Sequence, residues 1–243
     1  MKSVSETPPG ATFFGVAVRG PAHLRERLAC QDAFGGMAVD SGACITLADG
    51  MGSRRESSRG ARCATISAKR AFREWNRAPK AEPVWFSRLL ETRWRLAIAP
   101  LSPADCATTC LLAGWTSDSG LTTAALGDGI ILLREAGQTT RILSTRPDGY
   151  ALNETLALGC DHRLSDWSIS QLEPVAPWAV VLATDGVADD LDPARLEQFM
   201  DWLVNEIAPL PPHQRRIRLR EALRKWPTPG HSDDKSIAVL ISQ

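Results

Sequence analysis

The chain has 243 residues, of which 44% are hydrophobic, enough to bury a substantial core. Its 28 Lys and Arg residues balance its 28 Asp and Glu residues, so no overall charge attracts it to nucleic acid or to an anionic membrane. The N-terminus lacks the apolar run of a signal peptide, and no apolar stretch reaches the roughly 18 residues of a membrane span. We therefore expect a cytoplasmic protein, and the six scattered cysteines, which form no CxxC pair, are expected to be reduced thiols.

The first predicted elements follow a polar N-terminus. Residues 1–11 contain two prolines and a glycine and predict a flexible lead-in, which leaves 12–243 as a single catalytic domain. A first strand is expected from Phe13, and a second over 43–48 that ends at Asp49. Apolar residues spaced by three and four then predict three amphipathic helices, over 59–75, 86–97 and 196–207.

Further strand-like segments lie between and after these helices. They are short and rich in β-branched and aliphatic residues, and they cover 108–115, 121–126, 130–133, 179–184 and 236–241. Because strands and helices come in blocks and do not alternate strictly, the pattern predicts an α+β fold with mainly antiparallel strands.

Two of the predicted strands end in the same dipeptide, Asp49–Gly50 and Asp185–Gly186. A carboxylate at a rigid strand end, followed by the unobstructed carbonyl of a glycine, supplies the oxygen ligands that Mg²⁺ or Mn²⁺ prefers. Asp-Gly is also the favoured two-residue hairpin turn, which is sufficient to explain Asp128–Gly129 between 121–126 and 130–133. Asp128 could still face a metal cluster.

Further acids adjoin predicted strands: Asp32 near the start of the chain, and Asp233 and Asp234 before the last strand. A central sandwich could gather these acids with Asp49 and Asp185 at one edge. Clustered carboxylates repel one another unless cations lie between them.

Five motifs in order resemble the protein phosphatase 2C, or metal-dependent, protein phosphatases. They are GlnAspAlaPhe at 31–34, AlaAspGlyMetGly at 48–52, LeuGlyAspGly at 126–129, ThrAspGly at 184–186 and AspAspLysSer at 233–236. The resemblance spans about 13–241 and is closest to a short bacterial branch, with Gly20, Pro21 and His23 before the first motif and AsnGluThr at 153–155. It implies a four-layer α/β/β/α sandwich, in which two mainly antiparallel sheets are flanked by helices.

The resemblance also implies a site for two Mn²⁺ or Mg²⁺ ions. By position, Asp49 bridges both ions, the carbonyl of Gly50 binds one of them, Asp185 and Asp234 hold the other, and Asp32 holds metal-bound waters. A third ion is possible, for which Asp128 and Asp233 are secondary candidates.

The implied activity is that of a serine/threonine phosphoprotein phosphatase, a phosphoric monoester hydrolase. A water or hydroxide that bridges the two cations would attack phosphorus in line. Arg27, five residues before Asp32, matches the family's phosphate-binding arginine, with Arg25 as the rival candidate. Met51 stands where many eukaryotic members have the histidine proposed as the leaving-group acid. The implied setting is bacterial signalling, with a monomeric enzyme that opposes a Ser/Thr kinase on a phosphorylated protein.

Two other functions fit the same residues: a pseudophosphatase acting as a binding or regulatory module, and a phosphatase of a small phosphorylated metabolite. The basic segment 213–225 raises the question of a polyanionic or acidic partner, although such a run is usually a solvated helix face. Because it lacks interleaved aromatic residues, we expect no nucleic-acid binding.

Overall fold

The structure is a computed structural model that describes residues 10–78, 82–144, 156–226 and 232–242. Most of the predicted lead-in over 1–11 and the AsnGluThr segment at 153–155 lie outside the described residues. In the part of the chain that is described, ten strands form two sheets of five, and every paired strand is antiparallel to its neighbour.

The first sheet, sheet I, contains both ends of the described chain. Its strands follow the order β1 (Ala11–Val18), β10 (Lys235–Ser242), β9 (Trp178–Ala183), β6 (Ile130–Glu135) and β7 (Arg141–Ile142). Sheet II follows the order β2 (Asp32–Val39), β3 (Gly42–Asp49), β4 (Cys110–Thr116), β5 (Gly120–Leu126) and β8 (Ser168–Leu172).

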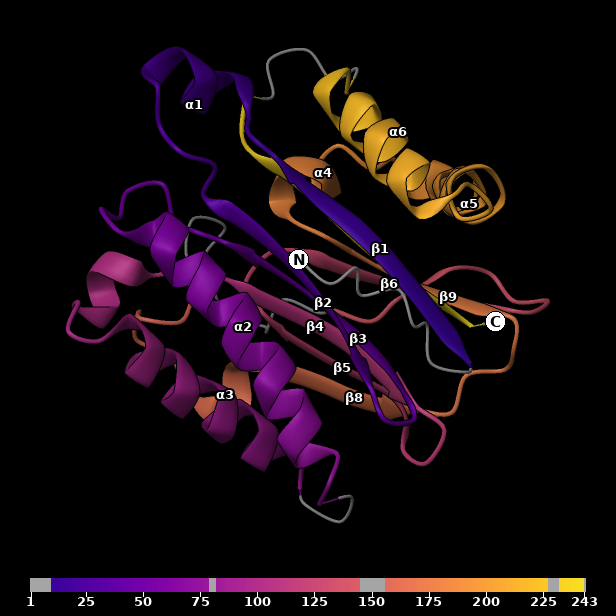
Figure 1. Cartoon of the computed structure of the whole chain (residues 1–243), viewed down its shortest axis with the longest axis horizontal. Helices are drawn as coiled ribbons and strands as arrows, with labels where there is room; N and C mark the ends of the chain where they lie inside the picture. The colour runs from indigo at the N-terminus through magenta and orange to yellow at the C-terminus, as the bar shows by residue number, and fades with distance from the viewer. Residues whose placement is uncertain (1–9, 79–81, 145–155, 227–231, 243) are drawn as a thin grey trace.

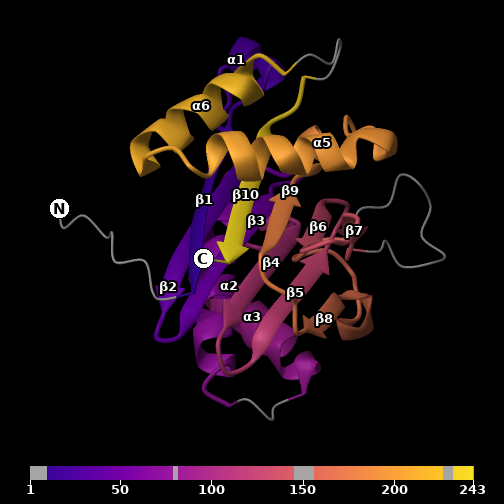
Figure 2. The ribbon, with the colours of Figure 1, turned by 90° about the vertical axis from the view of Figure 1, so that its right-hand side faces the viewer.

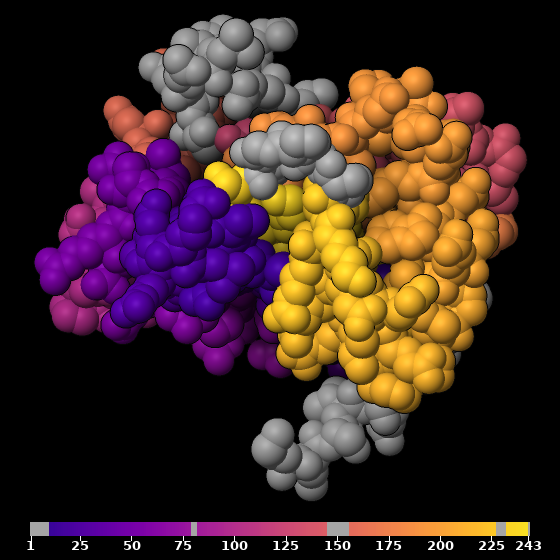
Figure 3. Space-filling model, turned by 90° about the horizontal axis from the view of Figure 1, so that it is seen from above, coloured from indigo at the N-terminus to yellow at the C-terminus, as the bar shows by residue number. Residues whose placement is uncertain are grey.

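Helices cover the outer faces of both sheets, which gives the four layers seen in Figures 1 and 2. Sheet II is covered by α2 (Ser57–Trp75) and α3 (Pro83–Ile98), and sheet I by α5 (Leu196–Asp201) and α6 (Pro212–Arg224). Two short helices, α1 (Pro21–Glu26) and α4 (Asp185–Ala188), lie at one end of the sandwich, where α1 (indigo) faces α6 (yellow) in Figure 3. Three short 3₁₀ turns lie at Pro103–Cys106, Leu164–Asp166 and Pro193–Arg195. The four-layer sandwich is therefore confirmed.

Three apolar cores hold the layers together. The central core lies between the sheets and includes Ile45, Leu47, Leu111 and Val180, which are all buried. The outer cores lie between each sheet and its helices. On sheet II, small residues on one face of α2 let the helix pack closely against the strands, namely Ala61, Ala64, Ala68 and Ala71.

The two edge strands β1 and β2 are interlocked through glycines. A Cβ atom on Gly15 would lie 2.6 Å from the Phe34 ring, and one on Gly36 would lie 2.3 Å from the Phe13 ring. Each aromatic ring therefore occupies the space that a side chain on the opposite strand would need. This packing fixes how sheet I and sheet II meet along one side of the sandwich.

Most of the predicted elements are confirmed, within a few residues at their ends. The helix predicted over 196–207 is α5 followed by a π-helical segment, Trp202–Ile207. Three strands were missed: β2, in which two glycines interrupt the apolar pattern, and the short edge strands β7 and β8. No helix among the described residues is long and apolar enough to cross a membrane.

Candidate metal site

Acidic residues from both sheets come together at one end of the sandwich. Asp32 is the first residue of β2 and pairs in register with Asp49, the last residue of β3. Asp185 begins α4 directly after β9, while Asp233 and Asp234 precede β10, which is the antiparallel neighbour of β9. Strand pairing therefore brings together acids that are up to 200 residues apart in the sequence.

A pocket of about 400 Å³ opens at this end. Asp49, Gly50, Asp128, Asp185 and Asp233 all line it, as does His23. None of the described lining residues is an arginine or a lysine. The pocket is therefore rich in carboxylates.

Asp32 lies beneath this pocket and is only 6% exposed. Its Oδ2 atom accepts hydrogen bonds from the hydroxyls of Ser236 at 2.7 Å and Thr184 at 2.9 Å, which belong to the opposite sheet or its end. Its Oδ1 atom is buried and has no hydrogen-bond partner among the described residues. Burial, and to a lesser extent the charges of Asp234 and Asp185, raises the pKa of Asp32 to about 7.

Asp49 and Asp185 form the centre of the cluster. Burial raises the pKa of both carboxyls; the charges of Asp32 and Asp185 add to the effect on Asp49, and those of Asp128 and Asp233 to the effect on Asp185. Each of these two carboxyls also affects the pKa of the other, so they lie close together. A divalent cation in this place would reduce the repulsion between them.

The backbone around Asp49 is held by two threonines that the sequence analysis did not single out. The carbonyl of Asp49 accepts hydrogen bonds from the Thr109 N–H and from the Thr108 hydroxyl, both at 2.8 Å. The N–H of Asp49 donates to the Thr109 hydroxyl at 3.0 Å. Next in the chain, Gly50 packs so closely on Ser57 that a Cβ would lie 2.7 Å from the Ser57 carbonyl group. The loop that carries the candidate ligands is thus rigidly placed.

The neighbours Asp233 and Asp234 have different surroundings. Asp234 is 2% exposed, and its carboxylate accepts hydrogen bonds from the N–H groups of Gly20 and Gln31, both at 2.6 Å. His23 Nδ1 lies 2.9 Å from the same carboxylate. Asp233, by contrast, is exposed and lines the pocket. Asp233 is therefore the more accessible of the two, whereas Asp234 is held by the segment that carries α1, and both assignments as cation ligands stay predictions.

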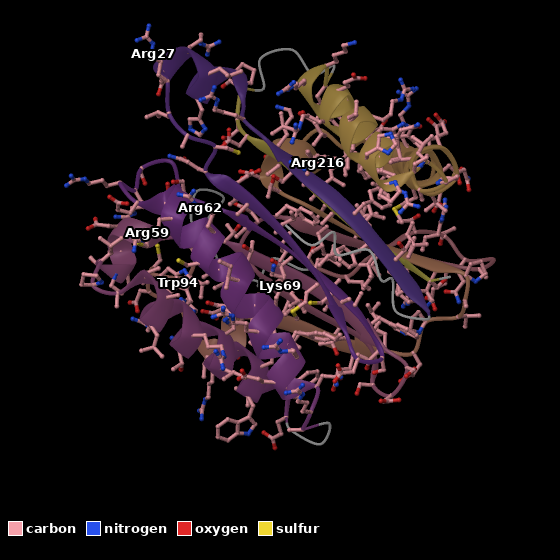
Figure 4. The ribbon with its side chains drawn as sticks, in the orientation of Figure 1. Arg27, Arg59, Arg62, Lys69, Trp94 and Arg216 are labelled. Atoms are coloured by element: carbon pink, nitrogen blue, oxygen red, sulfur yellow. The ribbon has the colours of Figure 1, made fainter. Side chains whose placement is uncertain are left out.

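Arg27, the predicted phosphate clamp, does not line the pocket, and neither does Arg25. Pro21 starts a helix that carries the chain outward, and Arg27 ends it in the left-handed conformation, with φ of 58°. Figure 4 shows Arg27 at the end of α1 that is far from the sheets. The structure thus brings together all the predicted carboxylates but not the predicted arginine.

The donor set fits hard divalent cations, because it consists of carboxylates, one of them with an unpartnered buried oxygen, and the carbonyl of a glycine. As the side chains stand, no three His, Cys, Asp or Glu residues of the described chain are close enough together to enclose an ion. Binding would therefore require rotations of the exposed carboxylates, such as that of Asp233.

The four-layer sandwich and its acidic pocket agree with the result of a family comparison. The family model described as Protein phosphatase 2C matches residues 19–226. The chain therefore belongs to the protein phosphatase 2C family. No curated protein sequence matches it.

Solved structures share the fold over nearly the whole chain. PppA, described as a key regulatory component of the type VI secretion system in Pseudomonas aeruginosa, is 16% identical, with a TM-score of 0.67 over 98% of this chain and 100% of that one. The catalytic domain of the serine threonine protein phosphatase PstP, in complex with two manganese ions, is 16% identical, with a TM-score of 0.61 over 96% and 98%. The S. agalactiae serine/threonine phosphatase is 15% identical, with a TM-score of 0.64 over 96% and 100%.

Proposed function

We propose that this member of the family is a metal-dependent phosphatase that hydrolyses phosphoserine and phosphothreonine in proteins with two Mn²⁺ or Mg²⁺ ions. The observation that carries the proposal is the pocket in which carboxylates from the ends of both sheets meet, with no lysine or arginine among its described lining residues. Burial and mutual repulsion raise the pKa values of Asp49 and Asp185, so a cation would stabilise their charged forms. Manganese in the PstP structure supports the choice of metal.

Within this proposal, Asp49 and Asp185 are the central ligands because they lie side by side at the pocket. The Gly50 carbonyl and the exposed Asp233 carboxylate complete the set, in place of the buried Asp234. Asp32 acts from below, where its unpartnered Oδ1 can accept a hydrogen bond from a water. A bound pair of divalent cations supplies water activation and neutralises phosphoryl oxygens.

Asp128 stays a candidate for a third cation. It lines the pocket at the turn between β5 and β6, and its charge contributes to the raised pKa of Asp185. The turn itself needs glycine, since Gly127 has a φ of 118°. The strands on either side, β5 and β6, lie in different sheets, so the hairpin expected at Asp128–Gly129 is wrong, and this segment crosses from sheet II to sheet I.

The negative charge of the phosphoryl group would be balanced by the cations, and the imidazole of His23 also lines the pocket. His23 Nδ1 lies 2.9 Å from the Asp234 carboxylate, which orients the ring. We do not assign Arg27 or Arg25 to this task, because neither lines the pocket.

The substrate class rests on the family and on neighbours whose descriptions name serine/threonine phosphatases. A phosphoprotein that a Ser/Thr kinase has modified is the expected partner. The test is hydrolysis, by purified protein with Mn²⁺ and then Mg²⁺, of phosphoserine, phosphothreonine and phosphotyrosine peptides and of p-nitrophenyl phosphate. Asp185→Asn serves as the control, and its activity should fall to background.

Each outcome of this assay separates the candidates. Hydrolysis of phosphoserine and phosphothreonine peptides that requires the divalent ion supports the proposal. Hydrolysis of p-nitrophenyl phosphate without hydrolysis of any peptide would point to a small phosphorylated metabolite. Calorimetric Mn²⁺ binding without turnover of any substrate would point to a pseudophosphatase.

A further inference from the structure

A second hollow, of about 610 Å³, lies on the side of the sandwich where the two edge strands meet. Its floor is formed by β1 and β2, and its walls by α2 of sheet II and α6 of sheet I. Four cationic side chains line this hollow, which we call the basic groove: Arg62, Lys69, Arg216 and Arg220. Figure 4 shows Arg62 and Lys69 on α2 and Arg216 on the other side of β1, near α6.

The cations of the basic groove have no acidic partner in the described part of the chain. None of the four forms an ion pair there, and Arg62 only donates a hydrogen bond to the Ser58 carbonyl. Asp32 is the one acidic residue among those that line the groove, and it is buried. Four like charges gathered by two helices, in a chain whose net charge is zero, create a local positive potential.

The floor of the groove offers backbone groups as well. β1 pairs only with β10 and β2 only with β3, so each strand has one free edge. Among the described residues, no additional backbone hydrogen bond involves either strand. Alternate N–H and C=O groups of such an edge can pair with an added extended segment.

An apolar contact completes the surface. Ile66 lies on α2, between Arg62 and Lys69 in the sequence, and is 44% exposed. It lines the groove, as does Phe34. Phe34 itself is only partly exposed, because it packs against Gly15. The groove thus has no open aromatic face on which nucleic-acid bases could stack.

We propose that the basic groove binds an extended acidic segment of a partner protein. Acidic side chains would meet the four cations on the two walls, and the backbone of the segment would lie along the edge strands. A peptide fits the combination of backbone groups, an isoleucine and flanking cations better than a nucleic acid does. The inference is independent of the proposed function, because binding can be measured without turnover.

The test uses a fluorescein-labelled peptide of eight residues, the length of β1, with alternating Glu and Val. Fluorescence anisotropy at low ionic strength should show binding that weakens with added salt, and a Lys-Val peptide of the same length should not bind. Lys69→Glu combined with Arg216→Glu, one change on each wall, should weaken the binding at least about tenfold, because attraction becomes repulsion. Hydrolysis of p-nitrophenyl phosphate should be unchanged in this variant.

The matched control keeps the same helices and the same change in net charge. Arg70→Glu combined with Arg218→Glu alters exposed arginines of α2 and α6 that do not line the groove, and binding should stay within about twofold of the unmodified protein. Circular dichroism checks that each variant is folded, and Lys69→Gln with Arg216→Gln offers a milder pair in case the first does not fold.

Three results would overturn the proposal. If both double variants lose binding equally, the peptide responds only to net charge. If no binding occurs at low ionic strength, the cations merely keep the free strand edges from associating. If a single-stranded oligonucleotide of equal charge binds more tightly than the peptide and depends on the same residues, the groove is a nucleic-acid site.

Discussion

Replacing Asp234 with alanine should destabilise the fold, whereas the same change at Asp233 should remove a cation ligand. The Asp234 carboxylate is buried and accepts the N–H groups of Gly20 and Gln31 at 2.6 Å. Alanine would leave both buried donors without an acceptor. His23, whose Nδ1 lies 2.9 Å from the carboxylate, would lose this contact as well.

The size of the effect follows from the number of groups left unsatisfied. Each buried donor without a partner costs about 1–3 kcal/mol, so we expect Asp234→Ala to lower the free energy of unfolding by about 4 kcal/mol. For a chain of this size, that corresponds to a decrease in Tm of roughly 8–16 °C. Asp233→Ala loses one exposed hydrogen bond, to the Asp234 N–H at 2.7 Å, and removes a charge that repels Asp185, so its Tm should change by only about 2 °C.

Thermal unfolding without divalent ions, together with calorimetric titration of Mn²⁺ and the phosphatase assay, separates the two effects. We expect Asp233→Ala to unfold at nearly the original temperature but to bind Mn²⁺ at least about tenfold more weakly. The reasoning would be refuted by the opposite pattern, in which Asp234→Ala keeps its Tm and loses Mn²⁺ affinity while Asp233→Ala binds Mn²⁺ normally.

Three further predictions concern the same end of the molecule. Asp49→Asn should lower metal-dependent turnover by about a hundredfold or more, and an unchanged rate would contradict the proposed site. The same change should raise the Tm measured without metal, because it removes a buried charge that neighbouring carboxylates repel. Burial raises the pKa of Asp32 from its ordinary 3.8 to about 7, so the folded state binds more protons than the unfolded state between these values. The stabilising contribution of Asp32 is therefore present below pH 4 and is lost as pH rises through 7. The loss amounts to up to roughly 4 kcal/mol. It is measured as the pH dependence of the difference in unfolding free energy between the unmodified protein and Asp32→Asn. Arg27→Ala should leave the KM for a phosphopeptide within about twofold, since Arg27 lies outside the pocket; a large increase would return it to the role of a clamp.

Local patterns in the sequence were sufficient to predict an α+β fold and strands that end in carboxylates, whereas the four-layer sandwich was implied by the resemblance to the protein phosphatase 2C family. Asp49 and Asp185 each follow a continuous apolar strand, and a strand that ends in Asp-Gly delivers its carboxylate to the edge of a sheet. The helix over α2 was equally visible, through alanines spaced by three and four.

The choice between Asp233 and Asp234 could not be made from their sequence. Which of two adjacent acids turns inward depends on the amide groups of Gly20 and Gln31, which are about 200 residues away in the chain. The position of Arg27 depends on α1, a helix of only six residues that no periodicity reveals, although Pro21 at its first turn is a starting signal. Strand β2 was hidden because Gly35 and Gly36 have low strand propensity, and Gly36 is required by packing against Phe13.

The hydrogen bonds from Thr184 and Ser236 to Asp32 cross from one sheet to the other, and the acidic pocket draws on both sheets in the same way. A cation bound there would link the two layers at the end that the apolar core between them does not reach. Its affinity should then respond to small displacements of one sheet along the other, such as those caused by Leu111→Ala in the central core. Conversely, Mn²⁺ at a hundred times its dissociation constant would stabilise the sandwich by about 2.7 kcal/mol. The concentration of available metal would therefore affect how stably the two sheets are held together, as well as the phosphatase activity.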